Sequence, residues 1–566
     1  MRCRAACWLL LAVSVAFAPA LWGEYLYDDR ALVLRNPALL DGDLPALLAR
    51  PFWGQQLGYW RPLPLLVMWL GDRLGGAAGV HALALLLHLI ATALAFDLGR
   101  RLLADTRLAL FAAACFALHP VQVETVAWAS AINEGLWGTF ALAAVRAADR
   151  WRHGGLGLPW GSALCCLLAM LSKETAIVTP LLVAMVLQLG PAGPRPRWRP
   201  FAASFAVVLS SWWGLRVVVF GDVSGGLLRT GDAAPLDGLR MVSAPAELLA
   251  RQLRLLLPPA TYTPFREFAP TVDAASAAAW LGLAAALVAV FTSGWRRGGR
   301  TLRLALGLLV LPLLPTVLLF RAVGAYPVAD RYLYLPAFGG GLLLASLLVH
   351  HVGRRPWPWL LPAAMAVLTF LQTFVWRDQQ RLVAAGLASS GGQSTLWVMA
   401  GDEQLDRAQR GDAAALPLAG SHYQTAERLA AGLSDERVAH RALGAARLGL
   451  AWCQLLALQG RSGPVTQSDY ATLIAAFQRA VQAGDDNADA WVGLGVANGA
   501  AGRGAEAEHA LRRAIELDPE NGKAWFNLGF LQANQRLVPA ARASLQRALQ
   551  LDPANQGARD LLLRLQ

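Results

Sequence analysis

The sequence predicts an all-α protein: a polytopic membrane bundle followed by a solenoid of short helical repeats. The first observation is composition, because 56% of the 566 residues are hydrophobic, only 16% are charged, and the mean hydropathy is +0.40. A soluble domain carries about 25% charged residues. The second observation is a change of character toward the C-terminus, where long apolar runs stop and a 34-residue repeat begins.

Eleven apolar runs are candidate membrane spans, although several are shorter than the ~20 residues that cross a bilayer. They lie near residues 6–22, 78–98, 106–119, 134–150, 156–171, 175–190, 201–220, 275–293, 302–320, 336–351 and 357–375. The net charge of +12 does not indicate a nucleic-acid partner, because the arginines form short clusters between these runs. That distribution is typical of membrane topology.

The charge of the loops predicts the orientation of the bundle. Arginine clusters fall on alternate loops, which the positive-inside rule places in the cytoplasm together with the N-terminus. The remaining loops and everything after residue 376 are then extracytoplasmic, on the periplasmic side if the source is bacterial. Ala18-Pro19-Ala20 would also fit a signal-peptidase site. Trp22 and Tyr25 instead favour a retained span with interfacial anchors.

The repeat near the C-terminus has the tetratricopeptide period. Trp491 recurs as Trp525, and "ELDPEN" at 516–521 recurs as "QLDPAN" at 550–555, an offset of 34 residues. The predicted domains are a membrane domain at 1–380, degenerate helical repeats at 395–487, and repeats at 488–521 and 522–555 within 488–566, with a terminal helix. Such stacks offer a surface for extended peptide, although a packing appendage that binds nothing is the alternative.

Ionisable residues gather in the loops predicted to be extracytoplasmic. Ionisable groups at membrane depth are costly and tend to line cavities, so we expect these residues to converge on one pocket. Asp28 and Asp29 follow the first run directly. The others, in chain order, are Arg61, His119, Glu124, Glu134, Lys173, Glu174, Arg321, Asp330 and Arg331.

Cations beside carboxylates at a membrane surface suit a lipid-linked sugar phosphate. The cations would hold the phosphate oxygens and stabilise the charge of the departing phosphate. Phosphate leaves without a general acid, so one carboxylate that deprotonates a hydroxyl acceptor suffices for an inverting displacement. A glycoside hydrolase needs a second carboxyl group across the bond, and the adjacent Asp28 and Asp29 tend to point apart.

Each of these features also has a structural interpretation. The acidic pair could be a solvated helix start, Lys173 and Glu174 could form an ion pair at the interface, and the Asp330-Arg331 pair could be structural. His119 precedes Pro120, a position typical of a residue at a helix end whose ring is hydrogen-bonded. Zinc spacing and a glycine-rich phosphate loop are both absent from the sequence, so we predict no nucleotide cofactor. A divalent metal at Asp28 and Asp29 is the alternative, but the fixed cations make it unnecessary and we predict none.

Several stretches then appear in the order of a known family. They are "YLYDDRALVLRNPAL", "YWRPLPLL", "FALHPVQVETVAWASAINEGLWGTFALAA", "LLAMLSKETAIVTPLL", "LLLPPATYTP" and "ADRYLYLPAFGGGLL". Together they resemble the transmembrane and tetratricopeptide-repeat protein O-mannosyltransferases and their bacterial relatives, in the C-type glycosyltransferase superfamily. The resemblance covers residues 1–380, and the repeats follow where that family has them.

The resemblance implies transfer of mannose or another hexose from a polyprenyl-phosphate donor to a protein Ser/Thr hydroxyl outside the cytoplasm. It places the catalytic base at Asp28 or Asp29, and analogy with related mannosyltransferases favours Asp28. The donor-phosphate candidates are Arg61, Lys173 and Arg331, and the second-tier pocket residues are His119, Glu124, Glu174 and Asp330. Glu134 departs from the family, where Asp is frequent, and only two clean repeats are visible.

Two rival functions stay open at this point. An enzyme of the same superfamily could glycosylate a lipid or polysaccharide, and nothing in the membrane half separates that from protein glycosylation. A non-catalytic transporter or scaffold with a repeat domain is the second rival. A transporter should show symmetry between its halves, which the sequence does not show.

Overall fold

The computed structural model divides the chain into two compact units, Met1–Ala385 and Gly386–Gln566. It describes every residue except 1, 35, 53–57, 191–192, 227–237, 258–262, 264, 267, 269–277, 279, 283–284, 286–298, 321–325, 434–435, 485–486 and 566. In the described part of the chain, regular structure is helical apart from one antiparallel bridge between Arg266 and Val328. The predicted all-α class is therefore confirmed.

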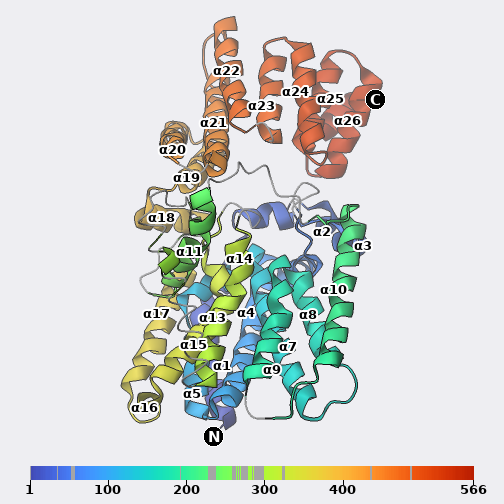
Figure 1. Cartoon of the computed structure of the whole chain (residues 1–566). Coiled ribbons are helices and arrows are strands. Elements are labelled where there is room, and N and C mark those ends of the chain that lie inside the picture. Colours follow the sequence, from blue (N-terminus) through green and yellow to red (C-terminus); the bar gives the residue numbers. More distant parts are fainter. Residues whose placement is uncertain are drawn as a thin grey trace. The chain divides into compact units, whose positions relative to one another are not determined.

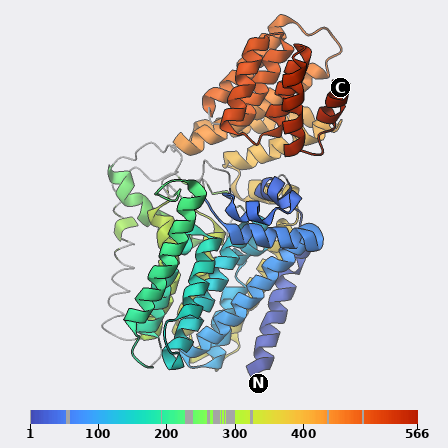
Figure 2. The same cartoon turned by 90° about the vertical axis from the view of Figure 1, so that its right-hand side faces the viewer.

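The long helices of the first unit run side by side as a bundle (Figures 1 and 2). They are rich in Ala, Leu and Val, and their shared faces form one continuous buried core. The long helices are α1 (Arg2–Phe17), α4 (Pro62–Leu103), α5 (Thr106–Ala117), α7 (Ile132–Gly154), α8 (Trp160–Ser172), α9 (Thr179–Leu189), α10 (Trp198–Phe220), α11 (Gly238–Arg254), α13 (Arg300–Val310), α15 (Pro336–Leu347) and α17 (Leu360–Val375). Helix α18 (Gln379–Ser390) contains the boundary between the two units.

Short elements interrupt the bundle wherever the sequence places polar residues and proline between apolar runs. Proline opens several of them, as expected where its missing N–H costs nothing. They are η1 (Ala18–Trp22), η2 (Arg30–Leu34), α2 (Pro37–Asp41), α3 (Leu44–Ala49), η3 (Pro120–Gln122), α6 (Val123–Ala127), η4 (Ala129–Ala131), η5 (Glu174–Val178), η6 (Leu311–Leu313), α14 (Leu314–Leu318), η7 (Asp330–Leu333), α16 (Val349–Val352) and η8 (Trp357–Trp359).

The predicted count of about eleven membrane spans is not confirmed. By length and composition, five described segments could cross a membrane: Arg4–Trp22, Pro62–Leu103, Trp198–Phe220, Arg300–Leu318 and Trp357–Val375. A sixth would be the pair Thr106–Ala117 and Pro120–Ala127, which is bent by 52°. Helices α8, α9 and α15 are apolar but shorter. The predicted span at 275–293 lies mostly outside the described residues, as does Arg321.

The longest helix, α4, is broken near its start. Gly75 and Gly76 have non-helical backbone angles, and Gly76 has φ +61° and ψ −142°. A side chain rarely tolerates that combination, so glycine is required there. The break separates a short first segment from the apolar segment that forms the predicted span, and the first segment packs against α3.

The first loop carries the short helices α2 and α3, which pack on the first segment of α4. Leu39 and Leu47 are fully buried in that contact, whereas Leu40 and Leu48 are exposed. Leu44 is half-buried, so the leucines of this loop divide between the protein interior and its surface.

Glycines in the "FGGGLL" stretch bring α15 close to its neighbours. A Cβ at Gly341 would clash with the Ala112 carbonyl oxygen of α5, and one at Gly339 would clash with the Leu309 nitrogen of α13. Close approach through small residues is how helices associate in a bilayer, where the hydrophobic effect supplies little attraction between them.

The second unit ends in two helix pairs at the predicted repeat positions. Asn487, Asn521 and Asn555 recur every 34 residues, and each side chain caps the helix that follows it. A Cβ at Gly495 or Gly529 would meet Leu511 or Leu545 of the paired helix at 2.6 and 2.8 Å. The helices are α23 (Ala488–Ala500), α24 (Gly504–Leu517), α25 (Gly522–Asn534), α26 (Val538–Leu551) and α27 (Gln556–Arg564).

Four longer helices precede these pairs and occupy the stretch where degenerate repeats were predicted. Each packs against the next along the chain, around the buried Tyr423 and Phe477. They are α19 (Ser394–Gln409), α20 (Ala415–Ala431), α21 (Glu436–Gln459) and α22 (Gln467–Ala483).

Candidate active site

The two adjacent aspartates after η1 have different surroundings. Asp29 is fully buried, and its carboxylate accepts hydrogen bonds from the backbone N–H of Leu26 at 3.0 Å and of Ser130 at 2.7 Å. The Ser130 hydroxyl donates a third hydrogen bond to the same carboxylate. Asp29 therefore joins the first loop to η4, and the solvated helix start considered above does not describe it.

Asp28 is only partly buried and accepts no hydrogen bond from any described residue. The preceding residue, Tyr27, has φ +36°, a strained value for a residue other than glycine that turns the chain sharply at this point. Burial and the neighbouring Asp29 raise the pKa of Asp28 to about 7, while the positive charge of Arg331 acts to lower it. Asp28 and Arg331 are thus electrostatic neighbours although they are far apart in the sequence.

Arg331 lies in η7 and is paired with Glu124 of α6. Its guanidinium forms an ion pair with the Glu124 carboxylate, and its backbone N–H donates to the other oxygen of that carboxylate at 3.2 Å. The guanidinium carbon also lies 5.3 Å from the centre of the Trp128 ring and 4.9 Å from that of Tyr332. The Arg331 side chain remains 16% exposed, whereas Glu124 is buried.

Lys173 lies between α8 and η5 and is enclosed more completely. Its ammonium forms an ion pair with Glu134 of α7 and sits 4.5 Å from the centre of the Tyr332 ring. The side chain is 4% exposed. Tyr332 thereby contacts both cations, which links the lysine pair to the arginine pair.

Glu174, the next residue, faces a different set of partners. It accepts from the Arg61 Nε at 2.9 Å and from the Trp60 backbone N–H at 2.9 Å, and Arg216 of α10 lies 3.6 Å away. Arg216 is completely buried and also donates to the backbone carbonyls of Gly58 and Gly225. Lys173 and Glu174 therefore do not pair with each other.

Two further predicted residues have partners of their own. Asp330 is paired with Arg266 at 3.1 Å, and burial raises the pKa of Asp330 to about 6, with Arg266 opposing and Glu124 reinforcing the rise. His119 caps η3 by accepting from the Val121 N–H at 3.2 Å, and its other ring nitrogen lies 3.2 Å from the Leu256 carbonyl. His119 is thus a helix-end residue, as its position before Pro120 suggests.

Comparisons with known proteins show what the chain is similar to. Residues 499–565 match the family described as tetratricopeptide repeat. The protein O-mannosyl-transferase Tmtc1 of Drosophila melanogaster is 35% identical over 32% of this chain and 22% of that protein. TMTC4 of Homo sapiens, also a protein O-mannosyl-transferase, is 25% identical over 67% of this chain and 62% of that protein. These matches confirm the resemblance to the protein O-mannosyltransferases that the sequence shows.

The chain spans only part of these relatives: 22% of the length of Tmtc1 and 21% of that of a second Drosophila melanogaster protein O-mannosyl-transferase, Tmtc2. Among solved structures, a thermophilic tetratricopeptide-repeat protein of Thermus thermophilus is 13% identical, with a TM-score of 0.26, over 36% of this chain and 94% of that one.

The stretches that resemble the O-mannosyltransferase family supply a connected group of ion pairs. Arg331 and Arg61 both experience the charge of Glu134, which itself pairs with Lys173. Arg331 and Arg61, with side chains 16% and 12% exposed, are the more accessible of the predicted donor-phosphate residues. No cluster of three or more His, Cys, Asp or Glu side chains suited to a metal was found among the described residues.

Three residues of the candidate site were not singled out in the sequence. Arg216 interrupts the apolar "SSWWGLRVVVF" stretch, and a lone arginine within a span is by itself a signal of a polar site. Arg266 and Ser130 carry no comparable signal, because each becomes notable only through its contact with Asp330 or Asp29.

Proposed function

We propose that this chain is a membrane glycosyltransferase that moves mannose from a polyprenyl-phosphate donor to a Ser/Thr hydroxyl of a protein. The relatives are protein O-mannosyl-transferases, which supports the sugar and the protein acceptor. The apolar segments support an enzyme whose donor keeps its lipid tail in the bilayer. The reaction takes place on the extracytoplasmic side, as the charge of the loops predicts.

The observation that carries this proposal is the contrast between Asp28 and Asp29. The carboxylate of Asp29 is occupied by three donors, so it holds the loop rather than accepting a proton from a substrate. The carboxylate of Asp28 has no donor among the described residues, and its pKa of about 7 suits a general base. Asp28 is therefore the proposed base, and Asp29 positions it.

The proposed step is a single inverting displacement. The acceptor hydroxyl oxygen bonds to the anomeric carbon of the sugar as its proton passes to the Asp28 carboxylate. The bond from that carbon to the donor phosphate oxygen breaks, and polyprenyl phosphate leaves with the electron pair. Holding donor and acceptor in line supplies the orientation that a bimolecular reaction lacks in solution.

Arg331 is the first candidate to hold the departing phosphate. Its positive charge acts on the carboxylate of Asp28, and its side chain is 16% exposed. Arg61 is the second candidate, and Glu174 orients it. Lys173 is enclosed by Glu134 and Tyr332, so it holds these two side chains in place and does not contact the phosphate. Because each cation already has a carboxylate partner, their positive charge is held in place before the donor binds.

The test is a transfer assay with the purified full-length chain, a synthetic polyprenyl-phosphate mannose and a Ser/Thr peptide. We expect a mannosyl peptide whose anomeric configuration is inverted relative to the donor. A nucleotide-linked mannose, offered as a matched control donor, should give no product. Transfer only to a lipid or glycan acceptor, or retention of configuration, would contradict the proposal.

A further inference from the structure

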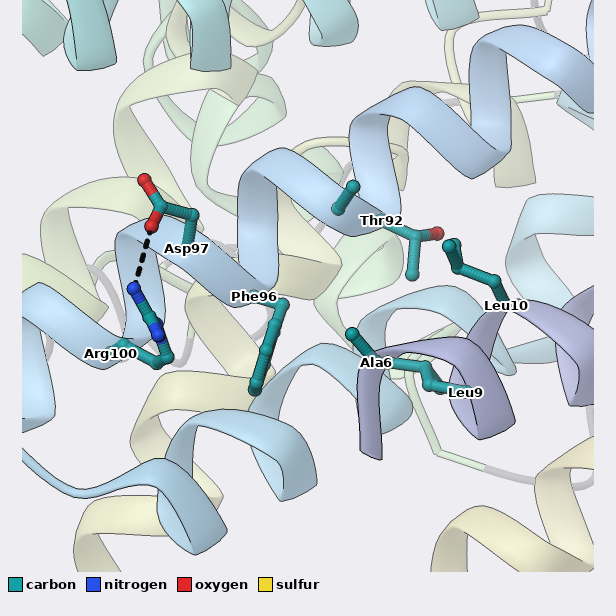
Figure 3. A pocket seen from close by; sticks show the side chains of 8 residues that line it. Ala6, Leu9, Leu10, Thr92, Phe96, Asp97 and Arg100 are labelled. Carbon is teal, nitrogen blue, oxygen red and sulfur yellow. Dashed lines mark hydrogen bonds and ion pairs between the residues drawn. The ribbon is translucent and has the colours of Figure 1, made fainter. Parts of the chain in front are cut away.

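A hollow of about 260 Å³ lies between α1 and α4, and it shares no residue with the group of ion pairs described above (Figure 3). Helix α1 contributes Ala6, Leu9 and Leu10 to its wall, and α4 contributes Thr92 and Phe96. The Thr92 hydroxyl donates to the His88 carbonyl of its own helix at 2.7 Å, so it offers no free donor to the hollow. The wall contributed by these residues is therefore apolar.

The hollow ends at a charged pair. Arg100 and Asp97 both line it, and they are joined by an ion pair at 3.1 Å (Figure 3). The Arg100 Nε is buried and has no hydrogen-bond partner among the described residues. Asp97 also lies 2.5 Å from Arg146 and 3.6 Å from Arg101, so its negative charge is already shared.

Positive charge exceeds negative charge around this end of the hollow. Arg100, Arg101 and Arg146 surround Asp97, and Arg101 and Arg146 also approach Asp149, the second carboxylate of the group. Arg4, which is exposed in α1 two residues before Ala6, adds a further positive charge. This excess of positive charge favours an anionic ligand.

We propose that this hollow binds an anionic phospholipid, with one acyl chain between α1 and α4 and the head-group phosphate at Arg100. Both helices form segments long and apolar enough to cross a membrane, so an apolar hollow between them meets hydrocarbon rather than water. Arg100 lines the hollow and its side chain is 32% exposed, so its guanidinium offers N–H donors to a phosphate oxygen. Basic pockets between membrane helices are known to select anionic head groups. This inference does not depend on the proposed transferase activity.

The experiment titrates the delipidated full-length protein in detergent with phosphatidylglycerol or phosphatidylcholine of identical chains and counts bound lipid by native mass spectrometry. We expect phosphatidylglycerol to bind about fivefold more tightly, which corresponds to about 1 kcal/mol for one arginine near an anionic head group. Inorganic phosphate should not displace it, because phosphate lacks the acyl chain. Displacement by inorganic phosphate, or equal binding of the two lipids, would overturn the proposal.

Three variants locate the site. Arg100→Gln should abolish the preference for phosphatidylglycerol, and Asp97 would keep Arg146 and Arg101 as partners. Arg355→Gln removes the same charge from an exposed residue that does not line the hollow and should leave the preference unchanged. Ala93→Trp fills the hollow from an exposed position and should weaken binding of both lipids. A preference that survives Arg100→Gln, or binding that survives Ala93→Trp, would overturn the proposal.

Discussion

At the scale of single residues, the two aspartates show how neighbours in the sequence acquire different roles. The carboxylate of Asp29 accepts hydrogen bonds from Leu26 and Ser130, whereas that of Asp28 accepts none from the described residues. In the sequence, only the family resemblance favours Asp28 over Asp29. The residues themselves cannot rank the two carboxylates, because the difference depends on Ser130, about a hundred residues away.

The pH dependence of transfer follows from the pKa of Asp28, about 7. A base must be deprotonated, so kcat/KM should rise as the pH increases through about 7 and level off above it. Arg331→Gln removes a charge that lowers this pKa and leaves Glu124 unpaired nearby, so the rising limb should move to higher pH. Arg331→Lys, which keeps the charge, serves as the control. A limb that Arg331→Gln leaves in place would contradict this electrostatic link.

Arg216 allows a second prediction at this scale. Arg216→Met breaks a buried ion pair with Glu174 and should lower the free energy of unfolding by about 3 kcal/mol. Freed from Arg216, Glu174 would hold Arg61 more tightly, so the KM for the donor should rise more than kcat falls. Arg199→Met, at an exposed position of the same helix, should change stability by less than about 0.5 kcal/mol. Equal effects of the two variants would show that Arg216 has no special role.

At the scale of elements, hydropathy predicts where helices lie better than it predicts how many cross a membrane. Helices occur at the described candidate runs, but α8 and α9 are cut short around Lys173 and Glu174, and α5 is followed by a sharp bend near His119. These interruptions bring polar residues to the candidate site. The same interruptions shorten the apolar helices, which is why the predicted number of membrane spans is not confirmed. The pairing of Lys173 with Glu134 and of Glu174 with Arg61 could not be predicted, because it depends on tertiary contacts.

The break in α4 gives a prediction at this scale. Gly76→Ala forces a side chain into φ +61° and should cost about 1–3 kcal/mol. Gly214→Ala is the matched control, because a Cβ meets nothing within 4 Å at either position and Gly214 lies inside helix α10. Replacing a helical glycine should be neutral or stabilising by about 0.5–1 kcal/mol. Thermal unfolding of both variants in one detergent checks the difference, and a neutral Gly76→Ala would contradict a strained break.

At the scale of the whole molecule, the two compact units account for the two compositions seen in the sequence. The 34-residue period is predictable because asparagine caps and small residues recur at fixed spacing. The longer helices α19 to α22 lack that spacing, so their boundaries could not be predicted from the repeat.

The second unit should fold without the first, because it has hydrophobic clusters of its own. Residues 386–566, expressed alone, should show helical circular dichroism and one cooperative thermal transition. Gly495→Val should lower its stability by about 1–3 kcal/mol, because a Cβ there would meet Leu511 at 2.6 Å. Gly420→Ala, in open space on α20, is the control. A fragment without cooperative unfolding would show that this unit depends on the membrane part.

The central claim is that Asp28 takes the acceptor proton while Asp29 holds the loop that carries it. The most direct test is the rate of mannose transfer by wild type, Asp28→Asn and Asp29→Asn, each compared with its own thermal unfolding midpoint. Asp28→Asn should lose about 10²–10⁴-fold in kcat with an unchanged or higher midpoint. Asp29→Asn should lower the midpoint, because it weakens the contacts to Leu26 and Ser130. Unchanged kcat in a folded Asp28→Asn variant would contradict the account.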